Sequence, residues 1–455
     1  MADSSVQPGK MLFSRNDLLR LILPLVIEQL LLMTVGVADT VMVTSAGEAA
    51  VSGVSLVDTI NSLIIQIFSA LSTGGAVVVS QYLGRQEVHN ARTAAKQLLY
   101  TMCLLSLSLM AIALLLRQHI LSFIFGRVEP DVMSSALVYF LLTASAYPFI
   151  GIYNSGAALF RAMGNSKISM FCSFIVNLIN ISVNAIFIYG FKMGAAGAGI
   201  GTLASRIAAA VIIMLLLNRS GNVVRVEKIL HFEFRGDMVR RILYIGVPTG
   251  MENGMFQVGR LLLLSLITTF GTSAVAANAI SNSIMNLVIV PGVALGLATV
   301  AVIGRCMGAE EIGQAEYYAK RLVGASYVCM IFMGGCLFFS SGFLVTLFDL
   351  SPEAAAMAAQ ILKVCALGNI LVYPLSFTMP HVLRASGDTI FTMIVSLSSM
   401  FACRVALSYL LACPWGLGLG LIGVWLAMVT DWAVRGICFL LRYRAGRWKS
   451  IRVIG

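Results

Sequence analysis

Charged residues are scarce in this sequence, and their scarcity decides the class of protein. They make up 11% of the 455 residues, whereas 59% are hydrophobic. A soluble domain typically carries about 25% charged residues. The composition therefore predicts a polytopic membrane protein and argues against a soluble enzyme with one anchor. The net charge of +11 does not indicate a nucleic-acid partner, because the basic residues lie mostly in short loops between apolar segments.

The residues and motifs of common catalytic centres are also missing. The 4 histidines are scattered and form no H-E-x-x-H pair, and the 9 cysteines lie mostly inside apolar runs without a C-x-x-C pair. No G-x-x-x-x-G-K-[ST] loop is present to bind the phosphates of a nucleotide. We therefore expect a protein that is not an enzyme, with no cofactor and no metal or disulfide framework.

What the sequence has in abundance is long apolar segments. A helix that spans a bilayer needs about 20 mostly apolar residues. We predict an all-α membrane protein with twelve transmembrane helices, at approximately 18–43, 50–80, 97–116, 135–160, 168–191, 197–217, 242–270, 274–303, 322–348, 355–382, 389–412 and 418–441.

The lysines and arginines between these segments predict their orientation, because cytoplasmic loops are enriched in them. With the N-terminus inside, 23 of the 31 fall in inside loops, and only three fall in outside loops, namely Arg117, Arg127 and Lys192. Both termini are therefore expected in the cytoplasm, and the first residues are too polar for a signal peptide. The expected location is the inner (plasma) membrane of a bacterium.

The chain also contains an internal duplication. Pro24 and Glu28 recur as Pro248 and Glu252, and LFRAMGN at Leu159–Asn165 recurs as VLRASGD at Val382–Asp388. We predict two pseudo-symmetric lobes of six helices, at 1–218 and 242–455, joined by a basic cytoplasmic linker at 219–241. Transporters built from such repeats bind the substrate between the halves and alternate access by rocking them.

Carboxylates inside the apolar segments are candidates for that chemistry, because a charge in the bilayer core costs at least about 2.5 to 3.5 kcal/mol. Glu28 and Asp39 are 11 residues apart, so they share one helix face about 16 Å apart along the axis. Asp39 is expected to bind a proton or Na⁺, and the alternative is an ion pair with Arg206 or Arg260. Glu28 and Glu252 follow prolines, so they are either cavity residues or partners for backbone groups freed by the proline.

Further polar side chains could line a cavity. Asp58 is a third acid inside the apolar segments of the N-terminal half, and Tyr153 follows a proline. Two amide stripes sit on single helix faces, where they would contact substrate or bond neighbouring helices: Asn177, Asn180 and Asn184 in one, and Asn278, Asn282 and Asn286 in the other. Asp431 is expected to pair with Arg435 one turn later.

These residues resemble a known family. VADTVMVTSAGEAAVSGVSLVDTI at Val37–Ile60, the paired LFRAMGNSK and VLRASGDT motifs, and NISVNAIFIYG at Asn180–Gly190 are similar to the multidrug and toxic compound extrusion (MATE) family. The likeness covers essentially the whole chain. It implies twelve helices in two lobes forming a V, and export of cationic or amphiphilic compounds in exchange for H⁺ or Na⁺.

The resemblance also assigns residues. Asp39 matches the acid of the family's N-lobe cation site, and Asn180 matches its fifth-helix asparagine. Asn184 stands where DinF-like members have a second aspartate, and Phe256 stands where NorM-like members have a seventh-helix acid, so neither subfamily pattern fits fully. We expect a monomeric antiporter for organic cations. The alternatives are a lipid-linked saccharide flippase, for which Arg206, Arg260 and Arg404 would provide positive charge, and an uncoupled channel.

Overall fold

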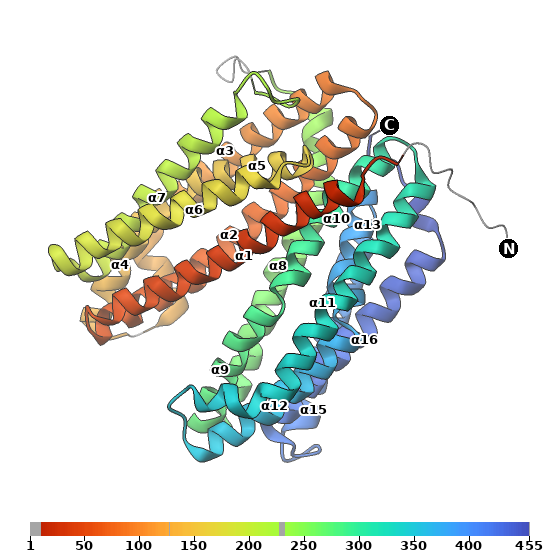
Figure 1. The fold of residues 1–455 in the computed structure, drawn as a ribbon. Helices are drawn as coiled ribbons and strands as arrows, with labels where there is room; N and C mark the ends of the chain where they lie inside the picture. The colour runs from red at the N-terminus through yellow and green to blue at the C-terminus, as the bar shows by residue number, and fades with distance from the viewer. Residues whose placement is uncertain (1–10, 127, 227–232, 455) are drawn as a thin grey trace. The chain divides into compact units, whose positions relative to one another are not determined.

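The computed structural model describes residues 11–126, 128–226 and 233–454 (Figure 1). Arg127, predicted in an outside loop, and residues 227–232 of the predicted linker lie outside this description. Within it, every regular element is a helix. The elements are α1 (Arg15–Thr44), α2 (Glu48–Gly84), α3 (Val88–Phe125), α4 (Pro130–Ser145), α5 (Tyr147–Ala162), α6 (Ser166–Ala185), η1 (Ile186–Gly190), α7 (Gly194–Leu217), α8 (Gly236–Thr268), α9 (Thr272–Val288), α10 (Val290–Gly308), α11 (Ile312–Thr346), α12 (Pro352–Leu371), η2 (Pro374–Thr378), α13 (Met379–Ser386), α14 (Thr389–Ser399), η3 (Met400–Ala406), α15 (Leu407–Ala412), α16 (Gly420–Arg444) and η4 (Arg447–Ser450).

Each of the twelve predicted segments is helical. Among the described residues, 10 helices are long and apolar enough to cross a membrane, or 11 when α4 and α5, bent by 45°, count as one span. The helix that falls short is α8, which at 33 residues is long enough. Its centre carries Glu252, Asn253, Gln257 and Arg260, which lower its mean hydropathy.

The described chain forms two compact units. The N-terminal unit is Arg15–Gly250. The C-terminal unit joins Met251–Gly455 to the stretch of the chain that ends at Ser14. The boundary thus falls inside α8, next to Pro248, which bends or weakens a helix because it cannot donate a backbone hydrogen bond. In the C-terminal unit, the backbone amide of Phe13 donates to the hydroxyl of Tyr318 on α11 at 3.0 Å.

The duplication is visible in the backbone. Gly47 and Gly271, one before α2 and one before α9, have φ values of 99° and 95°. Gln86 and Glu310, in the turns that follow α2 and α10, have φ values of 63° and 61°, which non-glycine residues rarely adopt. Each pair is separated by the sequence shift that relates Glu28 to Glu252. The two halves therefore share local conformations as well as residues.

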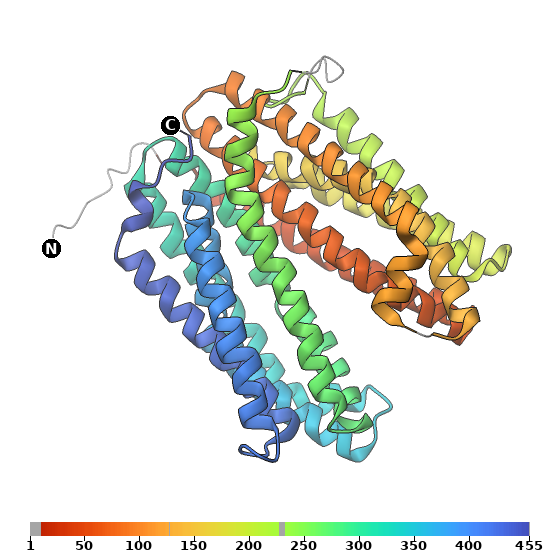
Figure 2. The same ribbon diagram turned by 180° about the vertical axis from the view of Figure 1, so that it is seen from behind.

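In the N-terminal unit, α1 packs chiefly against α6, and the two helices lie side by side in the ribbon views (Figures 1 and 2). The contacts run in register along both helices: Leu21 meets Ser166 near their first turns, and Asp39 meets Asn184 near their ends. The two helices are therefore parallel. They correspond to the first and fifth predicted segments. Because successive spans alternate in direction in the topology predicted from the loop charges, these two should run parallel.

Candidate functional site

The face of α1 that packs on α6 carries both predicted carboxylates. Asn184 donates to Asp39 at 2.7 Å, and Ser169 donates to Glu28 at 2.7 Å. Glu28 is 3% exposed, whereas Asp39 is partly exposed. The prediction that the two acids share a helix face is confirmed, but their surroundings differ.

An amide chain holds the Asp39 carboxylate in place. The side-chain nitrogen of Asn184 bridges Asp39 and the oxygen of Asn180, the latter at 3.3 Å, and Asn180 lies 3.5 Å from the hydroxyl of Ser205 on α7. Asn184 is fully buried, and its own amide oxygen has no hydrogen-bond partner. The Asn184 side chain fits only because residue 201 is a glycine: a Cβ on Gly201 would lie 1.8 Å from the amide oxygen of Asn184. The three predicted coupling residues are therefore brought together.

A pocket opens beside this chain and contains a second carboxylate. Its volume accessible to water-sized groups is about 90 Å³, and it is lined by Gly36, Asp39, Thr40, Val43, Val51, Val54, Ser55, Asp58, Tyr139, Ala198 and Thr202. Tyr139 donates to Asp58 at 3.0 Å. The residues of one apolar unit thus line one pocket with two acids, a phenol, two threonines and a serine. Carboxylate and hydroxyl oxygens are the ligands that hard cations prefer.

No basic side chain of the described residues forms an ion pair with Asp39. Arg206, one of the two alternative partners beside Arg260, acts on Asp39 only through its field, and its buried Nε has no hydrogen-bond partner. Within the same residues, no group of three or more His, Cys, Asp and Glu side chains could hold a metal ion. The Asp39 carboxylate is thus held by the amide of Asn184 and has no ion-pair partner among the described residues.

Glu28 and Glu252, in contrast, have arginine partners that the sequence analysis missed. Arg161 lies 3.4 Å from Glu28, and Arg384 lies 2.7 Å from Glu252. The predicted segments 135–160 and 355–382 end just before these arginines and leave both in cytoplasmic loops. In the structure they lie in α5 and α13, because those helices extend past the predicted apolar segments. The repeated LFRAMGN and VLRASGD motif contains both arginines, so it was the sequence feature that could have indicated these partners. The contacts of both glutamates are with side chains, and neither bonds a backbone group freed by its proline.

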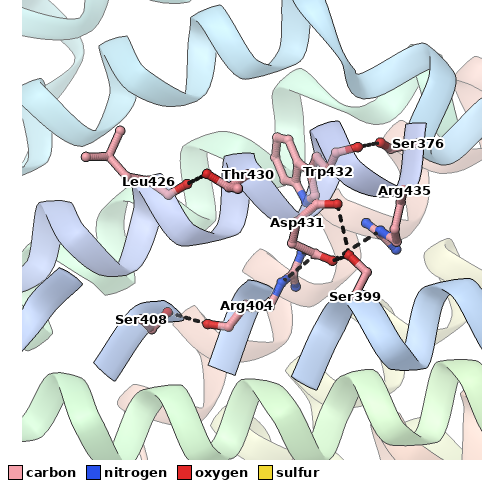
Figure 3. Close-up of polar contacts among 9 residues, drawn as sticks. All are labelled: Ser376, Ser399, Arg404, Ser408, Leu426, Thr430, Asp431, Trp432 and Arg435. Atoms are coloured by element: carbon pink, nitrogen blue, oxygen red, sulfur yellow. Dashed lines mark hydrogen bonds and ion pairs between the residues drawn. The ribbon is translucent and has the colours of Figure 1, made fainter. Parts of the chain in front are cut away.

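The corresponding region of the C-terminal unit has the opposite charge balance. Asp431 on α16 is fully buried and binds Arg404 at 2.8 Å and Arg435 at 3.5 Å (Figure 3). The predicted pairing of Asp431 with Arg435 is confirmed, although Arg404 is closer. Phe256, which stands where NorM-like members have an acid, lies under both guanidinium groups, with centroid distances of 5.3 and 4.8 Å.

The other predicted cavity residues make contacts within their own units. Asn177 donates to the backbone oxygen of Leu31 at 2.8 Å, Asn282 donates to the backbone of Asn278, and the side chain of Asn278 accepts from Trp425 at 3.2 Å. Tyr153 is 5% exposed and its hydroxyl has no hydrogen-bond partner. None of the four lines the pocket beside Asp39. Their roles in a cavity therefore stay predictions.

Comparison with known proteins agrees with this architecture. The MatE family model matches residues 24–186 and again residues 248–410, the same shift of 224 that relates the repeats.

Among curated proteins, the chain is 27% identical to the uncharacterized transporter YisQ of Bacillus subtilis over 93% of both chains. It is 24% identical to the probable multidrug resistance protein NorM of Thermotoga maritima over 97% of this chain and 94% of that protein. A solved structure described as "Crystal structure of MATE in the bent conformation" superposes with a TM-score of 0.88, at 20% identity, over 96% of each chain.

Proposed function

Because this chain belongs to the MatE family of multidrug efflux transporters, we propose that it is a secondary active antiporter. It exports cationic or amphiphilic organic compounds in exchange for H⁺ or Na⁺. The chain is a multi-pass membrane protein, and its family consists of transporters for small molecules. The coupling step is assigned to the N-terminal unit.

The observation that carries the proposal is the unpaired carboxylate of Asp39. It receives a hydrogen bond from Asn184 but no ion pair, and it shares a pocket with Asp58. A charge without a partner inside a membrane-spanning unit is unfavourable. The free energy therefore falls when a proton, a Na⁺ ion or an organic cation neutralises the carboxylate.

Exchange follows if only one of these cations is held at a time. A drug cation that arrives displaces the proton or Na⁺, and a proton or Na⁺ that arrives from outside displaces the drug. Asn184 holds Asp39 in one position, so the competitors meet the same carboxylate. Asp58 and the hydroxyls of Tyr139 and Thr202 provide the further oxygens that a Na⁺ ion would need.

The remaining parts of the proposal concern the whole molecule. We assign residues 1–218 and 242–455 to two lobes that alternate access by a rocker-switch motion around the substrate, with 219–241 as a cytoplasmic linker. We place both termini in the cytoplasm of a bacterium, on the inner side of its plasma membrane, and the working unit is a monomer. Glu28, Glu252, Asn177, Asn278, Asn282 and Tyr153 are assigned to walls of the substrate path.

Efflux from proteoliposomes tests the coupling residue. The assay follows a fluorescent organic cation while pH and Na⁺ gradients are imposed separately. Asp39→Asn keeps the shape and the contact with Asn184 but removes the charge, so we expect gradient-driven efflux to fall to the level of empty liposomes. Glu48→Gln, in the first turn of α2, is the matched control and should retain efflux. Wild-type efflux by Asp39→Asn would refute the assignment.

The two alternatives predict different results in the same vesicles. A lipid-linked saccharide flippase needs cationic side chains to hold a pyrophosphate, whereas the pocket at Asp39 presents carboxylates, which favours the antiporter. A channel would show no acceleration of labelled-cation uptake when unlabelled cation is present on the other side. Counterflow therefore separates exchange from simple leakage.

A further inference from the structure

The stretch of chain just before α1 is docked on the C-terminal unit. The backbone amide of Leu12 donates to Oε1 of Gln314 at 2.9 Å. The hydroxyl of Tyr318 accepts from the backbone amide of Phe13 at 3.0 Å and donates to its carbonyl oxygen at 2.6 Å. Gln314 and Tyr318 are one turn apart on α11, so three hydrogen bonds hold two successive residues to one helix face. We call residues 11–14 the N-terminal strap.

The side chain of Phe13 supplies an apolar anchor for this strap. Phe13 is 8% exposed, and its ring meets the ring of Tyr318 edge-on, with 5.7 Å between the centroids. The guanidinium carbon of Arg305 on α10 lies 5.7 Å from the same ring. Buried aromatic rings dominate contacts of this kind, and a cation over the ring face adds to them. The strap is therefore attached at one point, through one side chain and the backbone around it.

The repeat-related helix of the N-terminal unit, α3, also holds a stretch of chain, the one that precedes α8. Gln97 is 1% exposed, its Nε2 donates to the carbonyl of Glu233 at 2.5 Å, and its Oε1 accepts from the backbone amide of Arg235 at 3.2 Å. Under the shift of 224 residues, Gln314 corresponds to Asn90, two turns before Gln97 on the same face of α3. Each half thus uses a buried glutamine on its third span to hold the backbone that leads into the other half.

The two straps differ in where the chain goes next. The start of α8 stays in the N-terminal unit, where a Cβ on Gly74 of α2 would lie 2.5 Å from the backbone oxygen of Ile242. The chain passes into the C-terminal unit only within the continuous helix α8, after Gly250. The N-terminal strap, in contrast, leaves the C-terminal unit at once, between Ser14 and Arg15.

This difference makes the N-terminal strap a constraint on motion between the units. A single residue, Ser14, separates the docked Phe13 from α1, and one residue spans at most about 3.6 Å. A motion that takes the start of α1 further from α11 than this must undock Phe13 or unwind α1. Undocking exposes one ring, whereas unwinding pulls the first turns of α1 away from α6, where Ser166 donates to the carbonyl of Leu21 at 2.5 Å. Undocking is therefore the step that leaves both units intact.

We propose that Phe13 is a latch. Its socket on α10 and α11 holds the protein in one conformation of the transport cycle, and Phe13 leaves the socket when the units move to the other. The latch rests on the alternating access proposed above and adds a residue that controls it from outside the coupling site. The strap on α3 has no such role, because the chain on both sides of it stays in the N-terminal unit.

Reversible cross-linking of each strap tests the latch. The pair Leu12→Cys/Gln314→Cys fixes the N-terminal strap, and Glu233→Cys/Gln97→Cys is the matched control, since both pairs replace a contact between a glutamine and the backbone. A short bifunctional methanethiosulfonate reagent bridges each pair in the full-length protein in proteoliposomes, and mass spectrometry of peptides measures the bridged fraction. Wild type treated in the same way accounts for the 9 native cysteines.

The two bridged pairs should behave differently. In the first pair, gradient-driven efflux of the fluorescent cation should fall to the level set by the molecules left unbridged, and it should recover when the bridge is reduced. In the control pair, efflux should stay at its unbridged level. Efflux by the bridged Leu12→Cys/Gln314→Cys protein at its unbridged rate overturns the latch, because Phe13 would then not need to leave its socket.

Labelling of a single cysteine measures the anchor without any gradient. Gln314 is 6% exposed beside the docked strap, so Gln314→Cys should react slowly with a water-soluble maleimide in detergent. Adding Phe13→Ala removes the buried ring and should raise that labelling rate about ten- to hundredfold. Gln97→Cys should be labelled at the same rate with and without Phe13→Ala.

The outcomes separate the latch from the antiport on which it rests. A labelling rate of Gln314→Cys that Phe13→Ala leaves unchanged overturns Phe13 as the anchor. A wild type without gradient-driven efflux refutes the proposed antiport instead, and the labelling comparison still decides whether Phe13 holds the strap.

Discussion

The two buried glutamate–arginine pairs should differ in what they contribute to stability. Arg384 lies 2.7 Å from Glu252, and both side chains are less than a tenth exposed, at 9% and 5%. Arg384 donates to Glu252 through Nη2, and its Nε has no hydrogen-bond partner. Replacing Glu252 by glutamine therefore leaves a buried guanidinium without a counter-charge, a change that costs about 3–5 kcal/mol in buried pairs.

The repeat-related pair provides an internal comparison. Arg161 is 16% exposed and lies 3.4 Å from Glu28, and Ser169 also donates to Glu28. In Glu28→Gln the amide oxygen can still accept from Ser169, and Arg161 can reach water, so the expected cost is about 1–3 kcal/mol. Thermal unfolding in detergent should thus rank the wild type above Glu28→Gln, and Glu28→Gln above Glu252→Gln. The largest loss in midpoint is on the order of 10 °C.

The double variant Glu252→Gln/Arg384→Met tests the cause. Replacing a buried ion pair by apolar residues of similar size is often neutral, so this variant should recover most of the stability lost in Glu252→Gln. The reasoning is wrong if the double variant unfolds at the same temperature as Glu252→Gln, because the loss would then not come from a stranded charge.

Two further substitutions examine the pocket beside Asp39. Asp58→Asn keeps the contact with Tyr139 but removes the second charge, so cation efflux should persist at a reduced rate with weaker dependence on the Na⁺ gradient; unchanged Na⁺ dependence would exclude Asp58 as a ligand. Gly201→Ala places a Cβ 1.8 Å from the oxygen of Asn184, which must move and release Asp39. Efflux should fall at least tenfold, since a misplacement of about 1 Å can lower a rate by about a hundredfold, and wild-type efflux would show that the position of Asn184 is unimportant.

The sequence alone predicted the helices and the repeat because both depend on local or periodic information. An apolar run of about 20 residues can satisfy its backbone in a bilayer only as a helix, so composition was sufficient to predict that these segments are helical, and 10 or 11 of the described helices are apolar enough to span. The repeat placed Glu28 and Glu252 in equivalent positions without any knowledge of their contacts. Of the helices that match predicted segments, α8 falls short of the mean hydropathy of a span, because its centre contains Glu252 and Arg260.

Partners across helices could be predicted only in part. Asp431 and Arg435 are one turn apart, so their pairing follows from helix geometry and was found. Three helices lie in sequence between those that carry Glu28 and Arg161, and the helix limits predicted from hydropathy placed Arg161 in a loop. Similarly, nothing in the spacing of Asp39 and Asp58 indicates that one pocket contains both.

The sequence by itself determined that this protein crosses a membrane, is built from two related halves and carries acids within the bilayer, because bilayer burial and repetition act along the chain. Tertiary structure decided which of these acids are neutralised. Glu28 and Glu252 meet arginines, Asp431 meets two, and Asp39 meets only an amide. The physical reason is that the free energy of a buried charge depends on the groups within a few ångströms of it, and only helix packing brings those groups together.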